Sequence, residues 1–220
     1  MSATPAPRRV LLAGATGLVG SQCLDLLLED ATVASVTALV RRPLAGAEVR
    51  ARLRAEVVDF DALGARADLF AVDQVVCALG TTIGKAGSQA AFRRVDFDAP
   101  LQIARLALAG GARHFLLVSA LGADARSRIF YNRVKGELEE AVLALGFRSV
   151  TFARPSLLLG DRGERRFGEE IGRRVEFLFP AKYRGVHAQQ VAAALVKAAR
   201  DDAPGSRVIE NAELRTFEKA

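Results

Sequence analysis

The chain has 220 residues, of which 50% are hydrophobic, and a formal net charge of +6 at pH 7. This length and apolar fraction suit one large domain with a sizeable core, and no run of about 18 apolar residues marks a membrane span. Basic residues are scattered among acids with few aromatic residues, which argues against a nucleic-acid partner and favours a solvated surface with an anionic ligand.

Short apolar segments alternate with longer helix-patterned segments along the chain. Residues 1–7 are expected to form a flexible tail, and residues 8–220 one domain in which residues 155–190 build a substrate-side lobe. The alternation predicts an α/β protein: a doubly wound, mainly parallel sheet with helices on both faces and a short C-terminal substrate-side segment. The expected strands are Arg9–Ala13, Val33–Val40, Arg54–Asp59, Gln74–Ala78, His114–Ser119, Arg148–Ala153 and Arg207–Glu210. The expected helices are Leu18–Glu29, part of Ala62–Leu69, Pro100–Ala109, Ser127–Leu145, Glu164–Val175 and Ala188–Ala199.

Three glycines at three-residue intervals follow the first expected strand. Glycine suits a tight turn, a close backbone approach to a pyrophosphate and close packing of the next helix on its strand. Backbone N–H groups at the start of that helix then face the phosphates. Two arginines before an apolar run also resemble a secretory signal, but the glycines and the lack of a cleavage site argue against it. The pattern predicts a dinucleotide-binding turn made of Gly14, Thr16, Gly17, Leu18, Val19 and Gly20.

Two arginines, Arg41 and Arg42, follow the second expected strand, with no carboxylate between Asp30 and Glu48. A cofactor without a 2′-phosphate usually meets Asp or Glu at this point, whereas two guanidinium groups suit a 2′-phosphate. We therefore expect this pair to select NADP(H) over NAD(H). The alternative is a pair of ordinary solvated charges.

Two later loops supply further candidate cofactor contacts. Asp59 and Phe60 follow the third expected strand and are predicted to border the adenine, with a helix cap or surface turn as the alternative for Asp59. The loop after the fourth strand has a glycine that lets the backbone lie close to a cofactor. Its threonines offer hydroxyl groups, although threonines in such loops are also turn formers. The residues of this loop are Leu79, Gly80, Thr81 and Thr82.

Ser119 ends the fifth expected strand, and Tyr131 and Lys135 follow on the next helix. Their i,i+4 spacing puts the phenol and the ammonium group on one helix face. A nearby ammonium group stabilises a phenolate, so a tyrosine beside it can exchange protons. We predict that Tyr131 exchanges a proton with a carbonyl oxygen, that Lys135 supports it, and that Ser119 orients that oxygen. The tyrosine–lysine spacing alone is a weak signal.

The remaining polar residues carry weaker signals. Cys23 and Cys77 stand in apolar sequence, which indicates buried thiols in a reducing compartment, and we expect a cytoplasmic protein. His114 shows no partner and His187 is interpreted as a helix-entry or packing residue. No Cys or His pair has metal-ligand spacing, so no metal site is expected. The polar residues after Pro155 favour a solvated helix face over an acidic substrate site: Arg162, Arg165, Arg166, Lys182, Tyr183 and Arg184.

Several further motifs occur in the order typical of one enzyme family. They are Arg41-Arg42-Pro43, Leu79-Gly80-Thr81-Thr82-Ile83, Phe92-Arg93-Arg94-Val95-Asp96, Val118-Ser119-Ala120-Leu121-Gly122 and Arg154-Pro155. From about residue 8 to residue 200, the chain resembles an atypical short-chain dehydrogenase/reductase, in the NAD(P)H-binding branch that includes the Tat-interacting protein and bacterial proteins labelled nucleoside-diphosphate-sugar epimerases. The resemblance implies a Rossmann fold and, by analogy, a homodimer. It also implies an NADP(H) site at Gly14, Gly17, Gly20, Arg41 and Arg42 and a triad of Ser119, Tyr131 and Lys135.

Two departures from the family pattern leave two functions open. Typical members carry an asparagine on the helix before the serine-bearing strand, whereas Asp96 lies nearest that place here. Only 65 residues follow Pro155, which leaves little to hold a sugar nucleotide, so nucleotide-sugar epimerisation is the less favoured assignment. The first hypothesis is an NADP(H)-dependent oxidoreductase that transfers hydride to or from a small carbonyl or alcohol substrate. The alternative is an NADP(H)-sensing regulatory or protein-binding module with little or no turnover.

Overall fold

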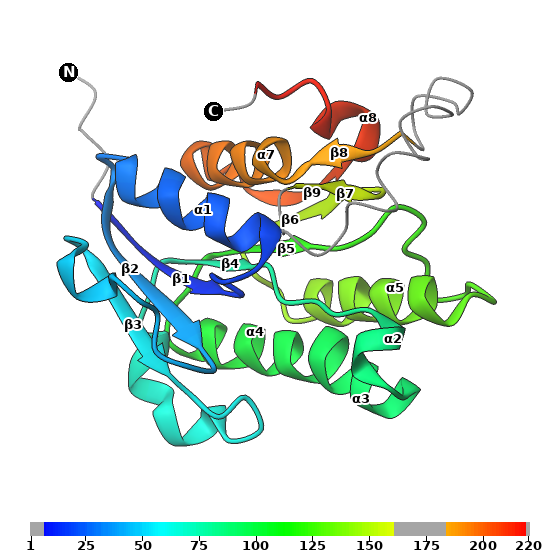
Figure 1. Cartoon of the computed structure of the whole chain (residues 1–220), viewed down its shortest axis with the longest axis horizontal. Coiled ribbons are helices and arrows are strands. Elements are labelled where there is room, and N and C mark those ends of the chain that lie inside the picture. Colours follow the sequence, from blue (N-terminus) through cyan, green and yellow to red (C-terminus); the bar gives the residue numbers. More distant parts are fainter. Residues whose placement is uncertain (1–6, 161–183, 219–220) are drawn as a thin grey trace.

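Seven parallel strands form the central sheet, in the order β3-β2-β1-β4-β5-β6-β9 (Figure 1). The computed structural model describes residues 7–160 and 184–218. The strands are β1 (Arg8–Ala13), β2 (Val33–Val40), β3 (Leu53–Val57), β4 (Gln74–Cys77), β5 (His114–Val118), β6 (Ser149–Arg154) and β9 (Gly205–Glu210). This is the doubly wound, Rossmann-like α/β arrangement, and the predicted fold class is confirmed.

Helices cover both faces of the sheet (Figure 1). The helices α1 (Leu18–Glu29) and α7 (Ala188–Asp201) lie over one face, and α4 (Ala99–Ala109) and α5 (Phe130–Leu143) over the other. On β1, Val10 and Leu12 pack into the core beneath α1 and α7, whereas Leu11 and Ala13 pack into the core beneath α4 and α5. Because both faces are covered, the central strands are continuous apolar runs and not alternating ones.

The connection order creates a topological switch between β1 and β4. The chain runs outward from β1 through β2 to β3, returns to β4 beside β1, and then continues in the other direction. Ala13 at the end of β1 pairs with Leu39 on β2 and with Cys77 on β4. In open parallel sheets, ligands bind outside the strand ends at such a point. We call this side of the sheet, where β1, β2, β4, β5 and β6 end, the carboxyl edge.

The helix before β5 is longer than predicted and contains a π-turn. Helical structure is continuous through α3 (Gln89–Arg93), the π-turn η3 (Arg94–Asp98) and α4. Pro100 explains the turn: it has no N–H to donate to the carbonyl of Asp96, and its ring would clash with that carbonyl in a regular α-helix. The predicted helix start at Pro100 is therefore wrong. The π-turn contains Asp96, whose side chain is fully buried.

Other boundaries differ for local reasons. The helix α5 begins three residues later than the predicted Ser127, because Asp124 and Ser127 accept backbone hydrogen bonds that form turns. The helix predicted at Ala62–Leu69 is a 3₁₀ segment, η2 (Leu63–Phe70), with a kink at Arg66. The short elements that were not predicted are η1 (Ala47–Val49), α2 (Ile83–Ala86), α8 (Asn211–Leu214) and the separate parallel pair β7 (Leu158–Leu159) and β8 (Val186–His187).

Some predictions fall outside the described residues. These are most of the N-terminal tail, the helix at Glu164–Val175, most of the substrate-side lobe, and all the polar residues named after Pro155 except Arg184. Within the described ranges both cysteines are buried free thiols, as predicted. Burial raises the pKa of Cys23 to about 12 and that of Cys77 to about 11, so both are inert thiols at pH 7. In the same ranges, no helix combines the length and apolarity needed to cross a bilayer.

Candidate functional site

The three glycines bring β1, α1 and β4 into backbone contact. Gly14 has a φ of +89°, and a Cβ atom there would lie 2.5 Å from the carbonyl oxygen of Ala78. A Cβ atom on Gly20 would lie 2.0 Å from the carbonyl oxygen of Gly14. Gly17 donates its backbone N–H to that same Gly14 oxygen at 2.8 Å. Any side chain at Gly14 or Gly20 would separate these elements, which is why glycine is required there.

The start of α1 suits an anionic group. Its first helical hydrogen bond runs from the Ser21 N–H to the Gly17 carbonyl, so the N–H groups of the preceding turn have no helical acceptor. Gly17 supplies no side-chain cap, and the first turn contains no acidic residue. The aligned peptide dipoles add partial positive charge at this end. The residues present therefore fit a pyrophosphate.

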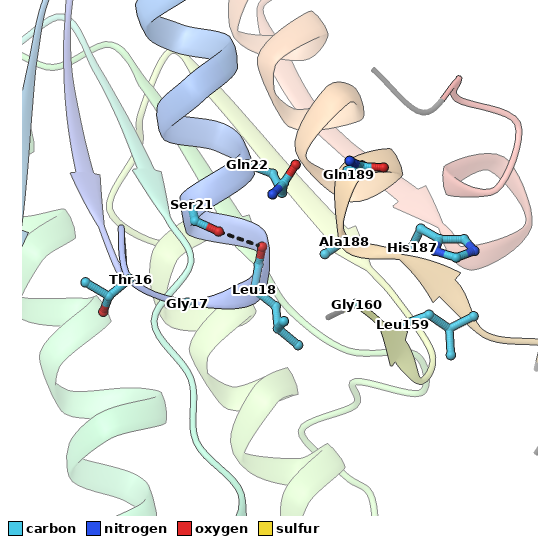
Figure 2. Close-up of a pocket in the computed structure, with 10 residues that line it drawn as sticks. All are labelled: Thr16, Gly17, Leu18, Ser21, Gln22, Leu159, Gly160, His187, Ala188 and Gln189. Atoms are coloured by element: carbon cyan, nitrogen blue, oxygen red, sulfur yellow. Dashed lines mark hydrogen bonds between the residues drawn. The ribbon is translucent and has the colours of Figure 1, made fainter. Parts of the chain in front are cut away.

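A pocket of about 290 Å³ opens between the starts of α1 and α7 (Figure 2). Gly160 keeps these elements close, because a Cβ atom there would lie 3.2 Å from Leu18 and 3.7 Å from Ala188. The start of α7 is already capped, since the His187 N–H donates to the Gln190 Oε1 at 3.1 Å. The pocket adjoins the glycine turn and belongs to the same candidate nucleotide site. Its lining residues are Thr16, Gly17, Leu18, Ser21, Gln22, Leu159, Gly160, His187, Ala188 and Gln189.

The predicted adenosine-side residues lie in the loops after β2 and β3. Arg41 and Arg42 directly follow β2, which pairs with β1, and both side chains are exposed. Asp59 forms a local turn in which its Oδ1 accepts the Asp61 N–H at 2.9 Å, the alternative that the sequence left open. Phe60 is half-buried and packs against the core beneath α4 and α5. Their contacts with a cofactor stay predictions.

The loop after β4 connects the glycine turn to a buried carboxylate. The Thr81 N–H donates to the Asp96 Oδ2 at 2.8 Å. Thr82 caps α2, since its Oγ1 accepts the Lys85 N–H at 3.2 Å, and this is the turn-forming role left open for it. Leu79 packs against the core beneath α4 and α5. Asp96 therefore fixes the backbone of the loop that is predicted to contact the cofactor.

Lys135 is buried and paired with Asp96. The Lys135 Nζ lies 2.7 Å from the Asp96 Oδ1, and their side chains are 4% and 1% exposed. Gly80 lies beside the pair: a Cβ atom there would be 3.5 Å from the Asp96 Oδ1 and 3.9 Å from the Lys135 Nζ. Burial opposes the charge on Lys135, but the carboxylate of Asp96 and then Tyr131 outweigh it, so the pKa of Lys135 lies above its usual value. Lys135 is therefore an ammonium group at pH 7.

Tyr131 stands one helical turn before Lys135 on α5 and is half-buried. Its ring packs against Phe92 on α3, with 5.6 Å between the ring centroids, and this contact holds the phenol in place. Tyr131 and Lys135 stand at i,i+4 on α5 and therefore share one face of the helix. The structure thus brings Tyr131, Lys135 and Gly80 together at the carboxyl edge. Their chemical roles stay predictions.

Ser119 donates its hydroxyl hydrogen to Glu139, which lies on α5 one turn beyond Lys135. Arg154 at the end of β6 binds the same carboxylate through two hydrogen bonds, of 2.6 Å and 3.0 Å. A hydroxyl group has one proton to donate, so in this arrangement the proton of Ser119 is not offered to a substrate oxygen. The predicted role of Ser119 would require it to leave Glu139.

Three side chains at the site were given no role by the sequence reasoning: Asp96, Glu139 and Arg154. For Asp96 and Glu139 the sequence contains a recognisable signal. Pro100 stands four residues after Asp96 and marks an irregular helix there. Glu139 stands four residues after Lys135 and therefore shares its helix face. Arg154 belongs to a motif that the resemblance already included, but its carboxylate partner is visible only in three dimensions.

His114 has structural partners at the opposite edge of the sheet. Its ring nitrogens lie 2.9 Å from the Thr151 Oγ1 and 3.1 Å from the Asp202 Oδ1. The interpretation that it has no partner is wrong, because Asp202 is 88 residues further along the chain. Burial lowers the pKa of His114 more than Asp202 raises it, so the ring is neutral at pH 7. Since His114 and Thr151 are both buried, this Asp–His–Thr chain has no access to a substrate.

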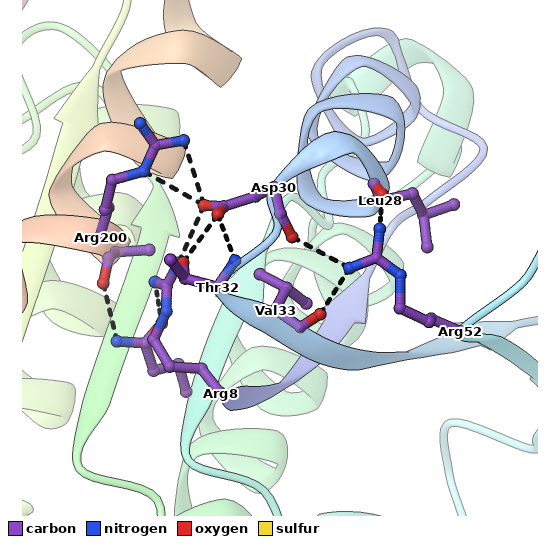
Figure 3. Close-up of polar contacts among 9 residues, drawn as sticks. Arg8, Leu28, Asp30, Thr32, Val33, Arg52 and Arg200 are labelled. Atoms are coloured by element: carbon purple, nitrogen blue, oxygen red, sulfur yellow. Dashed lines mark hydrogen bonds and ion pairs between the residues drawn. The ribbon is translucent and has the colours of Figure 1, made fainter. Parts of the chain in front are cut away.

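A buried charge cluster lies at the edge of the sheet where β1 and β4 begin (Figure 3). Asp30, directly after α1, accepts hydrogen bonds from the Thr32 N–H at 2.8 Å, Arg8 at 3.0 Å and Arg200 at 3.2 Å. Arg8 also donates to Gln74 at 2.8 Å, and the Gln74 amide donates to a carbonyl in the last turn of α7. The cluster ties β1, β4, α1 and α7 together. Because Asp30 is paired with both arginines and the polar groups bind one another across four elements, the cluster is a structural element.

A doubly wound parallel sheet, a glycine turn at its switch point and a tyrosine–lysine helix at the same edge define a Rossmann-type protein of the short-chain dehydrogenase/reductase kind. The chain belongs to the NAD(P)H-binding family, which it matches over residues 14–202. Its cofactor class is therefore a nicotinamide dinucleotide, and the glycine turn and the start of α1 described above fit the pyrophosphate of one.

Named relatives support this membership. The chain is 41% identical to protein HTATIP2 from Rattus norvegicus over 169 residues, which cover 76% of this chain and 69% of that protein. It is 33% identical to the mitochondrial protein FMP52 from Eremothecium gossypii over 221 residues, which cover 95% of this chain and 96% of that protein. The resemblance to the branch that includes the Tat-interacting protein is thereby confirmed.

Solved structures share the fold at low sequence identity. MoeE5 in complex with UDP-glucose and NAD matches with a TM-score of 0.71 and 19% identity, over 91% of this chain and 75% of that one. A UDP-N-acetylglucosamine 4-epimerase from Methanobrevibacter ruminantium M1, in complex with UDP-N-acetylmuramic acid, matches with a TM-score of 0.71 and 13% identity, over 94% and 77%. These likenesses establish the Rossmann-like fold and do not transfer a substrate.

Gly20→Ala tests the glycine turn. The added methyl group would overlap the Gly14 carbonyl, so we expect a stability loss of about 1–3 kcal/mol and weaker dinucleotide binding. Urea unfolding and fluorescence titration with NADPH measure the two effects. Gly64→Ala is the matched control, because a Cβ atom there meets nothing within 4 Å. Parental stability and affinity in Gly20→Ala would refute the close contact.

Asp30→Asn tests the buried cluster. The change removes the charge that compensates Arg8, which is buried, and should lower the free energy of unfolding by about 3–5 kcal/mol. Asp25→Asn is the control on the same helix: Asp25 pairs with Arg50 in an exposed bridge, whose loss should cost less than about 1 kcal/mol. Equal urea midpoints for the two variants would contradict a structural role for the cluster.

Proposed function

We propose that the protein is an NADP(H)-dependent oxidoreductase acting on a small carbonyl or alcohol substrate. The observation that carries the proposal is the buried Lys135 ammonium, held by Asp96 near the half-buried Tyr131 and beside Gly80. A tyrosine supported by a fixed cation is a proton donor and acceptor for a carbonyl oxygen. The proposal is supported by the position of Gly80, which follows β4 at the switch point where a dinucleotide binds in such sheets and lies beside Lys135.

In the proposed reaction, different residues of this chain transfer the proton, stabilise the phenolate and bind the dinucleotide. When bound, the nicotinamide supplies or accepts the hydride. Tyr131 gives a proton to the carbonyl oxygen during reduction and takes it back during oxidation. Lys135 stabilises the phenolate that remains, and its fixed position avoids the cost of reorganising a mobile charge. The N–H groups at the start of α1 and the Gly80 backbone hold the dinucleotide.

The preference for NADP(H) over NAD(H) is part of the proposal. It is supported by the exposed pair Arg41 and Arg42 after β2, next to the strand that carries the glycine turn. Guanidinium groups bind a phosphate through charge-assisted hydrogen bonds. The ribose hydroxyls of NAD(H) carry no negative charge and cannot form such bonds. No carboxylate stands between Asp30 and Glu48 to bind the ribose hydroxyls of NAD(H).

The Ser119–Glu139 hydrogen bond favours a second candidate function. With its proton given to Glu139, Ser119 does not polarise a substrate carbonyl, and the site loses one of two hydroxyl donors. This supports an NADP(H)-sensing module with little or no turnover. The nucleotide-sugar neighbours named above are only 19% and 13% identical to this chain and share its fold alone, so epimerase activity stays the least supported assignment.

The cellular setting is also proposed. The two buried thiols suit a reducing compartment such as the cytoplasm, whereas the FMP52 relatives are named mitochondrial. We expect no nucleic-acid partner, because the positive charge is dispersed along the sequence. A homodimer is expected from the family resemblance alone.

Tyr131→Phe separates the two candidate functions. The variant keeps the ring contact with Phe92 but has no proton to transfer, so NADPH oxidation in a carbonyl-substrate screen should fall by about 10²–10⁴-fold with NADPH affinity retained. The control is Asp25→Asn, which removes only an exposed ion pair on α1 and should keep full turnover. Undiminished turnover in Tyr131→Phe would exclude the mechanism. Tight NADPH binding without turnover in the parent would favour the sensing module.

The double variant Arg41→Ala/Arg42→Ala tests the cofactor preference. Loss of the charge-assisted hydrogen bonds should weaken NADPH binding by about 10–100-fold and leave NADH binding unchanged. Fluorescence titration with both nucleotides measures this. Arg50→Ala is a control from the same region whose side chain pairs with Asp25. Equal NADPH and NADH affinities in the parent protein would refute the preference.

A further inference from the structure

Asp96 lies nearest the place where typical members of the family carry an asparagine, and its carboxylate brings a buried negative charge next to Lys135. The side chain is fully buried in the π-turn, and both oxygens are engaged: Oδ2 accepts the Thr81 N–H at 2.8 Å and Oδ1 lies 2.7 Å from the Lys135 Nζ. An asparagine could supply the first contact but carries no charge for the second. The carboxylate therefore does something that the amide cannot.

We propose that Asp96 is a positioning and charge-compensating residue that forms a neutral pair with Lys135, so that Tyr131 stays a protonated donor at neutral pH and the site is set for carbonyl reduction. This inference rests on the proposed oxidoreductase function. A lone buried ammonium group would strongly favour the phenolate, because opposite charges attract strongly where water is excluded. A carboxylate at 2.7 Å from the same ammonium group offsets part of that field, so that Lys135 still stabilises the phenolate formed during proton transfer but does not favour it beforehand.

The other ionisable groups around the Asp96–Lys135 pair are paired with other residues, neutral or exposed. Asp96 is therefore the group that offsets the charge of Lys135. On α5, Glu137 is paired with Arg93 at 2.5 Å, and Glu139 with Arg154 at 2.6 Å. On β4, the Cys77 thiol is neutral because burial raises its pKa to about 11. Arg133 on α5 is half-buried and lies 4.0 Å from Glu137. The other charged side chains of these helices and the adjoining loops are exposed to solvent and thus screened: Lys85, Arg94, Asp98, Arg105, Asp124, Arg126, Arg128 and Glu140.

The positioning part of the role follows from the π-turn. In a regular helix Pro100 would clash with the Asp96 carbonyl, and the wider turn relieves this clash. The Asp96 carboxylate in this turn contacts both the loop after β4, at Thr81, and Lys135 on α5. Asp96 thereby fixes Lys135 relative to Gly80, the residue predicted to approach the cofactor.

The two tyrosines and the absence of tryptophan allow a test without any substrate. In a Tyr183→Phe background, the ultraviolet absorbance of phenolate reports Tyr131 alone as the pH is raised. We expect Asp96→Asn to move the midpoint of phenolate formation downward by about one pH unit or more. The matched control is Asp98→Asn, an exposed carboxylate two residues away, which should leave the midpoint where it is in the parent.

Two further variants keep the test decisive if Asp96→Asn does not fold. Lys135→Met leaves the carboxylate uncompensated and should move the midpoint upward, and the double variant Asp96→Asn/Lys135→Met should return it close to the parent value. An unchanged midpoint in Asp96→Asn, or equal shifts in Asp96→Asn and Asp98→Asn, would overturn the proposal. So would a Lys135→Met midpoint that the second change does not reverse. The titration requires no turnover, so its outcome is independent of the Tyr131→Phe assay.

Discussion

The carbonyl group of Gly14 is the point on which the architecture of the site depends. Gly17 donates a hydrogen bond to it, and Gly20 packs against it with no room for a Cβ atom. Gly14 itself lies against the backbone of Ala78 at the end of β4. The strand, the helix and the neighbouring strand across the switch point therefore converge on one residue. That convergence brings the start of α1 to the edge where Gly80 and Lys135 lie.

The second organising feature is one face of α5, along which three polar residues stand at four-residue intervals. Tyr131 packs against Phe92, Lys135 pairs with Asp96, and Glu139 binds Ser119 and Arg154. The helix is thus fastened to α3, to the π-turn and to two strand ends through the side chains that carry the chemistry. Buried groups held this way reorganise little when charge develops during a reaction.

The charges at the carboxyl edge are distributed unevenly. At the end of α5 the buried ions form neutral pairs, Lys135 with Asp96 and Glu139 with Arg154. At the end of β2, Arg41 and Arg42 are exposed and of one sign. Under our proposal an anionic cofactor is therefore attracted to the β2 side, whereas the buried ions beside the tyrosine are already paired. This division suits a charged dinucleotide beside a small neutral substrate.

Local sequence signals were sufficient for the positions of the strands along the chain, the two helix layers, the glycine turn and the tyrosine–lysine face, because each depends on residues close together in the chain. They were insufficient for Asp96, Glu139 and Arg154. The partners of Asp96 lie 15 and 39 residues away, and the ion pair of Arg154 with Glu139 joins β6 to α5. The helical structure before the predicted start at Pro100 was missed, because Pro100 lies within a helix that widens around it.

The Ser119–Glu139 contact reconciles the two candidate functions. The proposed oxidoreductase mechanism has two hydroxyl donors for the carbonyl oxygen, Ser119 and Tyr131. Here Ser119 donates instead to the buried carboxylate of Glu139, which Arg154 also binds. Removing one such donor typically costs about 10²–10³-fold in rate. Polarisation and proton transfer then both fall to Tyr131, which Asp96 keeps protonated under our proposal. The contact involves neither the glycine turn nor the arginine pair, so under our proposal it slows turnover without weakening nucleotide binding.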